Sequence, residues 1–156
     1  MKYTIPFLLF LYAFSPVFLF GQGAENKLME KDTALAQSLG ADEYGMKQYV
    51  MAFLKSGPER SQNKEEAMRL QKAHLDNISR MAREGSLLLA GPFLDNGDIR
   101  GIYIFNVKTV EEAQALTETD PAIKAGRLVM ELHPWYGSAA LMKLNEIHNQ
   151  LPTKDF

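Results

Sequence analysis

The sequence predicts one α+β domain in which a strand, a helix, two strands, a helix and a strand follow one another. Strand-like alternation flanks two helical segments, and each helical segment begins with a capping pattern. An Asn-Gly pair separates the two middle strands, as in a hairpin. A chain of 156 residues has the length of one such domain with a tail.

The first strand and the first helix are expected over residues 46–54 and about 63–84. Both faces of the strand are apolar, which predicts that other parts of the domain cover it on both sides. In the helix, apolar residues recur every three or four positions. Asn63 followed by Glu66 is a capping pattern, and Gly85 is the expected end of the helix.

The two middle strands are expected over residues 86–94 and 99–107. Asn96 and Gly97 lie between them and are typical of a tight hairpin connection. Pro92 has no amide proton, so its backbone nitrogen cannot donate a hydrogen bond to a neighbouring strand. The earlier of the two strands therefore belongs at an edge of the sheet.

Further helical segments and the last strand complete the predicted domain. Residues 109–117 read as a helix with a capping box at its start, and Asp120-Pro121 opens another helical turn. The last strand is expected over residues 127–135. Residues 138–150 are expected to form a C-terminal helix that packs either on the body of the domain or on a partner.

This element order is the ferredoxin-like βαββαβ pattern, with a four-stranded antiparallel sheet whose first and third strands are central. Helices on one face leave the other face of the sheet bare. Tyr103, Phe105, Val129 and Trp135 are large apolar candidates for the bare face. Exposed patches of this kind usually bind a partner. We therefore expect a homodimer with facing sheets, a dimeric α+β barrel.

The start of the chain reads as a signal peptide over residues 1–24. Lys2 supplies positive charge, residues 5–20 are almost wholly apolar, and small residues follow. An uncleaved membrane anchor is the alternative. With cleavage, the product is periplasmic or secreted and has no stable membrane anchor. Residues 25–45 are expected to form a linker or a short helix.

Composition excludes several classes of function. Seventeen Lys and Arg against 19 Asp and Glu leave no basic excess, which disfavours nucleic-acid binding. The absence of cysteine removes disulfides, thiolate zinc sites, iron–sulfur clusters and a cysteine nucleophile. Only three histidines are present, and no two have ligand spacing within one element, so neither a metal nor another cofactor is expected.

His74 and Asp120 each have two interpretations. His74 lies on the apolar stripe of the first helix, where it is either a core histidine or an acid–base group suited to proton transfer near neutral pH. Asp120 precedes a proline, and helix capping alone accounts for it. Its carboxylate could also orient His74, as the acid does in a catalytic triad.

His133 and Trp135 on the last strand are weaker candidates for substrate binding. Glu131 and His133 share one face of the strand, which indicates a wet cavity, a dimer contact or a solvent-exposed edge. Trp135 and Tyr136 line an aromatic pocket in one interpretation and pack at an interface in the other.

Gly91 and Pro92 could let a ligand approach the backbone, although such a pair more often marks a bulge or a protected sheet edge. Arg100 and Arg127 could hold an anionic substrate. Solvation at the surface is the commoner environment of either side chain.

Three motifs carry a resemblance to the YCII-related (YciI-like) domain family. They are HLDNISRMAREGSLLLAGPF from His74, DPAIKAGRL from Asp120 and VMELHPWYG from Val129, and the similar region spans residues 49–136. The resemblance implies a ferredoxin-like fold, dimers, and a paired histidine and aspartate suspected of catalysis, here His74 and Asp120. The family includes a dehydrochlorinase of a chlorinated hydroxyhydroquinone.

We therefore expect an exported member of this family, with the domain at residues 46–137 and a C-terminal helix and tail at 138–156. The expected activity is cofactor-independent His/Asp acid–base chemistry, an elimination or an isomerisation on a small molecule. The alternative is a non-catalytic module that binds a small ligand or serves as a structural dimer.

Overall fold

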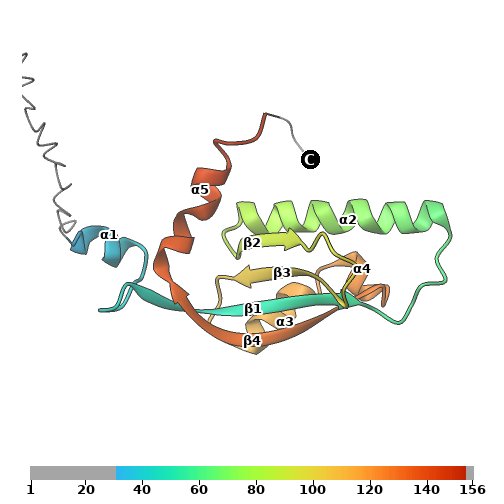
Figure 1. The fold of residues 1–156 in the computed structure, drawn as a ribbon, viewed down its shortest axis with the longest axis horizontal. Helices are drawn as coiled ribbons and strands as arrows, with labels where there is room; N and C mark the ends of the chain where they lie inside the picture. Colours follow the sequence, from blue (N-terminus) through green and yellow to red (C-terminus); the bar gives the residue numbers. More distant parts are fainter. Residues whose placement is uncertain (1–30, 154–156) are drawn as a thin grey trace, which may run out of the picture. The chain divides into compact units, whose positions relative to one another are not determined.

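The computed structural model describes residues 31–153, so the predicted signal peptide at 1–24 and the first part of the linker lie outside the described residues. Figure 1 shows the order of the elements. They are α1 (Thr33–Ser38), β1 (Met46–Ser56), α2 (Lys64–Arg83), β2 (Leu87–Pro92), β3 (Ile99–Phe105), α3 (Val110–Thr117), α4 (Pro121–Lys124), β4 (Leu128–Ser138), a 3₁₀ helix η1 (Ala139–Lys143) and α5 (Leu144–His148).

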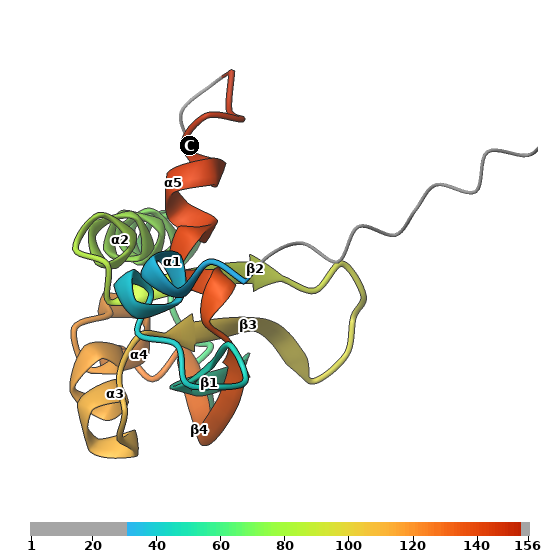
Figure 2. The same cartoon turned by 90° about the vertical axis from the view of Figure 1, so that its left-hand side faces the viewer.

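The four strands form one antiparallel sheet in the order β2-β3-β1-β4. β1 and β3 are central and β2 and β4 are edges, so the ferredoxin-like prediction is confirmed. Pro92 ends an edge strand, where a missing amide proton breaks no ladder on its outer side. Figure 2 shows α2, α3 and α4 together on one side of the sheet.

Local capping fixes where the two longer helices begin. The Asn63 side chain accepts a hydrogen bond from the Glu66 amide at 2.9 Å, which starts α2. Thr109 and Glu112 form a reciprocal capping box at the start of α3. Gly85, with a φ of +75°, follows the end of α2 in the left-handed region that favours glycine.

The main core lies between the sheet and α2 and α3. Its buried members are Val50, Ala52, Met81, Leu87, Tyr103, Phe105 and Ala113. The prediction that Tyr103 and Phe105 occupy the bare face is therefore wrong. Both alternating sets of β3 side chains are large and apolar, and it is the set containing Ile104 that faces the other way.

A second cluster covers part of the opposite face, which we call the open face. Tyr49, Leu88 and Ile104 are buried there beneath Leu141 and Met142 of η1. The C-terminal segment thus packs on the body of the domain, the first of the two predicted alternatives. Val129 and Trp135 lie on the open face as predicted, because they pair with outward residues of β1.

The connection between β2 and β3 is longer than the Asn-Gly signal alone indicates. Pro92 ends one strand and Ile99 begins the next. The Gly97 amide donates to the Asp95 side chain at 3.1 Å, which makes a local turn inside the loop.

Within residues 31–153, no helix is long and apolar enough to cross a membrane.

Candidate functional site

The structure brings His74 and Asp120 into direct contact although 46 residues separate them. The Nδ1 atom of His74 lies 2.5 Å from the Oδ2 atom of Asp120. The His74 side chain is 7% exposed and that of Asp120 is 1% exposed. A hydrogen-bonded ion or dipole pair so far from water is stronger than the same pair at the surface.

Asp120 makes a capping contact and a contact with His74 at the same time. Its Oδ1 atom accepts a hydrogen bond from the Ala122 amide at 2.8 Å and caps α4. Its Oδ2 atom contacts His74. Because the cap fixes the carboxylate in the turn, the imidazole has a partner whose position is set by the backbone.

This contact determines which nitrogen of His74 carries a proton in the neutral ring. A carboxylate accepts hydrogen bonds, so Nδ1 carries a proton and donates it, and in the neutral ring Nε2 keeps its lone pair. The hydroxyl of Tyr103 lies 3.3 Å from Nε2, which is long for a hydrogen bond. Burial, and then the charge of Asp120, raise the pKa of Tyr103, so it stays a neutral hydroxyl that can donate.

A second set of polar contacts ties α2 to the turn that carries Asp120. Asn77 follows His74 by one helical turn, and its Oδ1 atom accepts from the Thr119 hydroxyl at 3.1 Å and from Arg80 at 2.9 Å. The Arg80 guanidinium also donates to the Thr119 hydroxyl at 3.0 Å. These bonds hold the residue next to Asp120 against the helix that presents His74.

His74 lines a cavity of about 320 Å³. This volume is at the small end of the range of about 300–1,000 Å³ that is usual for small-molecule sites. The cavity lies where β1 and β2 end and β3 and β4 begin. Its lining consists of Leu54, Ser56, Arg60, Gln71, His74, Pro92, Arg100, Ala122, Arg127 and Leu128.

Some of the predicted binding residues lie at this cavity and others do not. Pro92, Arg100 and Arg127 line it. Gly91 pairs with Ile102 in the sheet and is not among the lining residues. A Cβ atom placed on Gly91 would have no neighbour within 4 Å, so the space beside it is open.

His133 lies away from His74, on the open face. Its Nε2 atom is 2.9 Å from a carboxylate oxygen of Glu131, and Lys55 pairs with the same carboxylate. Hydrogen bonds from Lys55 and then His133 lower the pKa of Glu131. The His133 side chain is 48% exposed, and its ring meets the edge of Phe53 at 5.6 Å between centroids.

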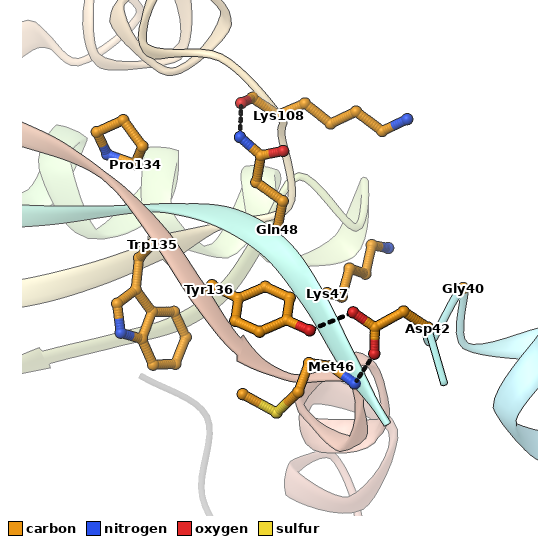
Figure 3. A pocket seen from close by; sticks show the side chains of 9 residues that line it. All are labelled: Gly40, Asp42, Met46, Lys47, Gln48, Lys108, Pro134, Trp135 and Tyr136. Carbon is orange, nitrogen blue, oxygen red and sulfur yellow. Dashed lines mark hydrogen bonds between the residues drawn. The ribbon is translucent and has the colours of Figure 1, made fainter. Parts of the chain in front are cut away.

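Trp135 lines a second, wider cavity of about 670 Å³, shown in Figure 3. Its ring packs on Tyr49 at 5.9 Å between centroids. Figure 3 shows the hydroxyl of Tyr136 directed at Asp42, and this hydrogen bond lowers the pKa of Asp42. Trp135 and Tyr136 thus share a cavity with each other but not with His74.

Residues 31–153 contain no group of three or more metal-binding side chains that could hold a metal ion. Sequence reasoning misses the contribution of Tyr103 and Arg60 to the site. The alternation in β3 gives no sign that Tyr103 faces the helices. Arg60 lies in a loop without any local motif, and only the folded chain places it beside His74.

The fold and the site together define a class: a ferredoxin-like α+β domain with a buried His–Asp pair beside a small cavity. A model of the YCII-related domain matches residues 48–136, more than half of the chain, and the chain belongs to this family. This confirms the resemblance expected from the three motifs. No curated protein matches the chain.

Among solved structures, the chain is similar to 5-chloro-2-hydroxyhydroquinone dehydrochlorinase from Burkholderia phenoliruptrix AC1100, whose structure is a complex with 2,5-dihydroxybenzoquinone. The identity is 20% and the TM-score is 0.41. The match covers 55% of this chain and 92% of the dehydrochlorinase chain.

Proposed function

We propose that this chain is a cofactor-independent acid–base catalyst that carries out an elimination or an isomerisation on a small molecule. The observation that carries the proposal is the buried contact of 2.5 Å between His74 and Asp120 beside a cavity of about 320 Å³. General base catalysis needs an oriented imidazole beside a substrate cavity, and here the Nε2 atom of His74 has only the long 3.3 Å contact with the Tyr103 hydroxyl.

In the proposed reaction, Nε2 of His74 takes a proton from a substrate carbon. In an elimination the C–H electron pair forms the new double bond, and the leaving group departs from the neighbouring carbon with its own electron pair. In an isomerisation the proton returns from Nε2 to another atom of the same molecule. Asp120 stabilises the imidazolium that forms in either case, as the acid does in a catalytic triad.

A proton-exchange experiment tests the proposal before the natural substrate is known. Small enolisable carbonyl compounds and hydroxyaromatic acids are incubated with the protein in D₂O, and loss of the C–H signal is followed by NMR. For a compound that exchanges, His74→Gln is expected to slow exchange by about 100-fold or more, the usual contribution of a general base. Asp120→Asn is expected to slow it as well.

His148→Gln is the matched control, because it removes the imidazole of the exposed histidine of α5. Unfolding curves of each variant separate a lost base from a lost fold. Exchange that persists unchanged in folded His74→Gln would refute the proposal. Binding of the compounds without exchange or turnover would favour the alternative, a module that holds a small ligand.

We further propose that the chain is exported and works as a homodimer joined through the open face. The charge and apolar order of residues 1–24 support export. On the open face, Phe53 and Ile102 are half-buried, and Val129 is 41% exposed. An apolar surface on a sheet between charged side chains is typical of a protein interface.

Sedimentation equilibrium tests the dimer. The protein without residues 1–24 is expected to sediment as a dimer, and Val129→Lys is expected to shift it towards monomer, because a lysine ammonium would enter an apolar contact. Leu75→Lys is the matched control: Leu75 lies on α2 and is 42% exposed. A monomeric parent protein, or equal effects of both variants, would contradict the proposal.

A further inference from the structure

We infer that the cavity beside His74 binds a small organic anion, with Arg60, Arg100 and Arg127 holding the negative group. The inference deepens the proposed function and rests on it where the anion is a substrate. The anion consists of a carboxylate or a similar oxyanion attached to a compact apolar body. Three features of the cavity support this chemistry.

The first feature is that three arginine residues line one cavity. Arg60 comes from the loop after β1, Arg100 from the start of β3 and Arg127 from the turn before β4. Arginines from three separate segments of the chain therefore line the same cavity as His74. A guanidinium group matches a carboxylate with two parallel hydrogen bonds, which is why arginine is common in sites for such anions.

The second feature is that these charges lack partners of opposite sign in the described part of the chain. Within residues 31–153, none of the three arginines forms an ion pair with a carboxylate. Arg60 donates to the Arg127 carbonyl at 3.1 Å, Arg127 to the Gln62 side chain at 3.0 Å, and Arg100 to the Gly97 carbonyl at 3.4 Å. Each guanidinium has five N–H donors, so most remain for a ligand or water.

The third feature is the apolar remainder of the lining. Leu54, Pro92, Ala122 and Leu128 line the same cavity as the arginines. Inorganic phosphate would leave this apolar surface unused, whereas a small organic anion buries it and gains hydrophobic stabilisation. The lining as a whole thus fits a molecule that is charged at one end and apolar at the other.

The backbone around two of the arginines is held firmly in place. The Gly57 amide donates to the Arg127 carbonyl at 2.9 Å, and the Glu59 amide donates to the Gly126 carbonyl at 3.0 Å. These bonds tie the loop that carries Arg60 to the turn that carries Arg127. The backbone positions of Arg60 and Arg127 are therefore set before an anion binds, which lowers the ordering cost of binding.

Such a site would also assist the proposed chemistry. When His74 removes a proton from carbon, negative charge develops on the substrate. Guanidinium groups bound to the anion stabilise that charge where it forms. In this account Arg60, Arg100 and Arg127 bind and stabilise, and His74 transfers the proton.

Benzoate is the probe for the experiment, with benzamide as the uncharged analogue and inorganic phosphate as the anion without an apolar body. Each is titrated into ¹⁵N-labelled protein without residues 1–24, and backbone and arginine side-chain signals are followed by NMR. Benzoate is expected to shift signals around the cavity and to bind more tightly than either comparison compound. Arg127→Gln and Arg100→Gln are each expected to raise the Kd for benzoate about tenfold or more.

Arg83→Gln is the matched control, since Arg83 is an exposed residue at the end of α2 that does not line the cavity, and it is expected to leave the Kd unchanged. Equal binding of benzoate and benzamide, tighter binding of phosphate, or no effect of the cavity arginines would overturn the inference. His74→Gln separates the two proposals. If it abolishes proton exchange but still binds benzoate, both hold; if exchange fails in the parent protein while arginine-dependent binding persists, only the proposed function fails.

Discussion

Replacing Asp120 by alanine is expected to lower the free energy of unfolding by about 2–4 kcal/mol. The substitution removes two contacts at once. The Nδ1–H group of His74, whose side chain is only 7% exposed, loses its partner, and α4 loses its cap on the Ala122 amide. Urea unfolding measures the effect as a lower midpoint with an unchanged slope.

Two further variants divide this loss into its parts. Thr109→Ala removes a helix cap with no histidine behind it and is expected to cost about 1 kcal/mol. Asp120→Asn keeps an oxygen that can cap α4 and is expected to cost less than the alanine variant. If Asp120→Ala destabilises the protein no more than Thr109→Ala, the contact with His74 contributes nothing and the account of the pair is wrong.

Gly57→Ala is expected to destabilise the protein by about 2–4 kcal/mol, at or above the usual range for overpacking. A Cβ atom on Gly57 would lie 2.1 Å from the Gly126 carbonyl oxygen. Because that oxygen belongs to the backbone, no side-chain movement can relieve the clash. The loop would have to move away from the turn before β4. Because Arg60 and Arg127 lie on these two segments, benzoate binding is expected to weaken as well.

Gly91→Ala is the matched control for this substitution. Gly91 is also a glycine near a strand end, but the methyl group of an alanine there would meet nothing within 4 Å. The stability of this variant is expected to stay within about 0.5 kcal/mol of the parent protein. A Gly57→Ala variant with the stability and the benzoate affinity of the parent would contradict the close packing of the loop against the turn.

The fold was predictable because its signals are local and agree with one another. Asn63 and Thr109 mark helix starts through side-chain bonds to amides three residues away. Pro92 marks an edge strand through its missing amide proton. The apolar pattern on both faces of β1 indicates a central strand. Together these signals leave few sheet orders other than the observed one.

Which face of the sheet the helices cover was not predictable from β3 alone. Tyr103 and Phe105 alternate with Ile102 and Ile104, and all four are large and apolar. When both alternating sets are apolar, the pattern predicts a strand but does not show which set faces the helices. An extra residue in β2 near Leu88 makes the facing of the sheet harder to predict. It shifts the register of β2 against β3 by one residue.

Part of the candidate site was also predictable from local sequence signals, and part was not. Asp120 was identifiable as a cap from its own neighbours, but a contact across 46 residues has no local signal, and the family resemblance supplied the pairing with His74. Arg60 is an exposed charged residue in a loop, which sequence alone assigns to solvent. The Gly57 and Gly126 backbone contacts that bring Arg60 to the cavity appear only in the folded chain.

The protonation of the His74 ring tests the central claim most directly. Long-range ¹H–¹⁵N spectra of protein labelled in its three histidines, with His74 assigned by comparison with His74→Gln, show which ring nitrogen carries the proton. The account predicts a proton on Nδ1, hydrogen-bonded to Asp120, and a lone pair on Nε2 whenever the ring is neutral. A neutral ring protonated on Nε2, or His74 signals that are the same in Asp120→Asn, would contradict it.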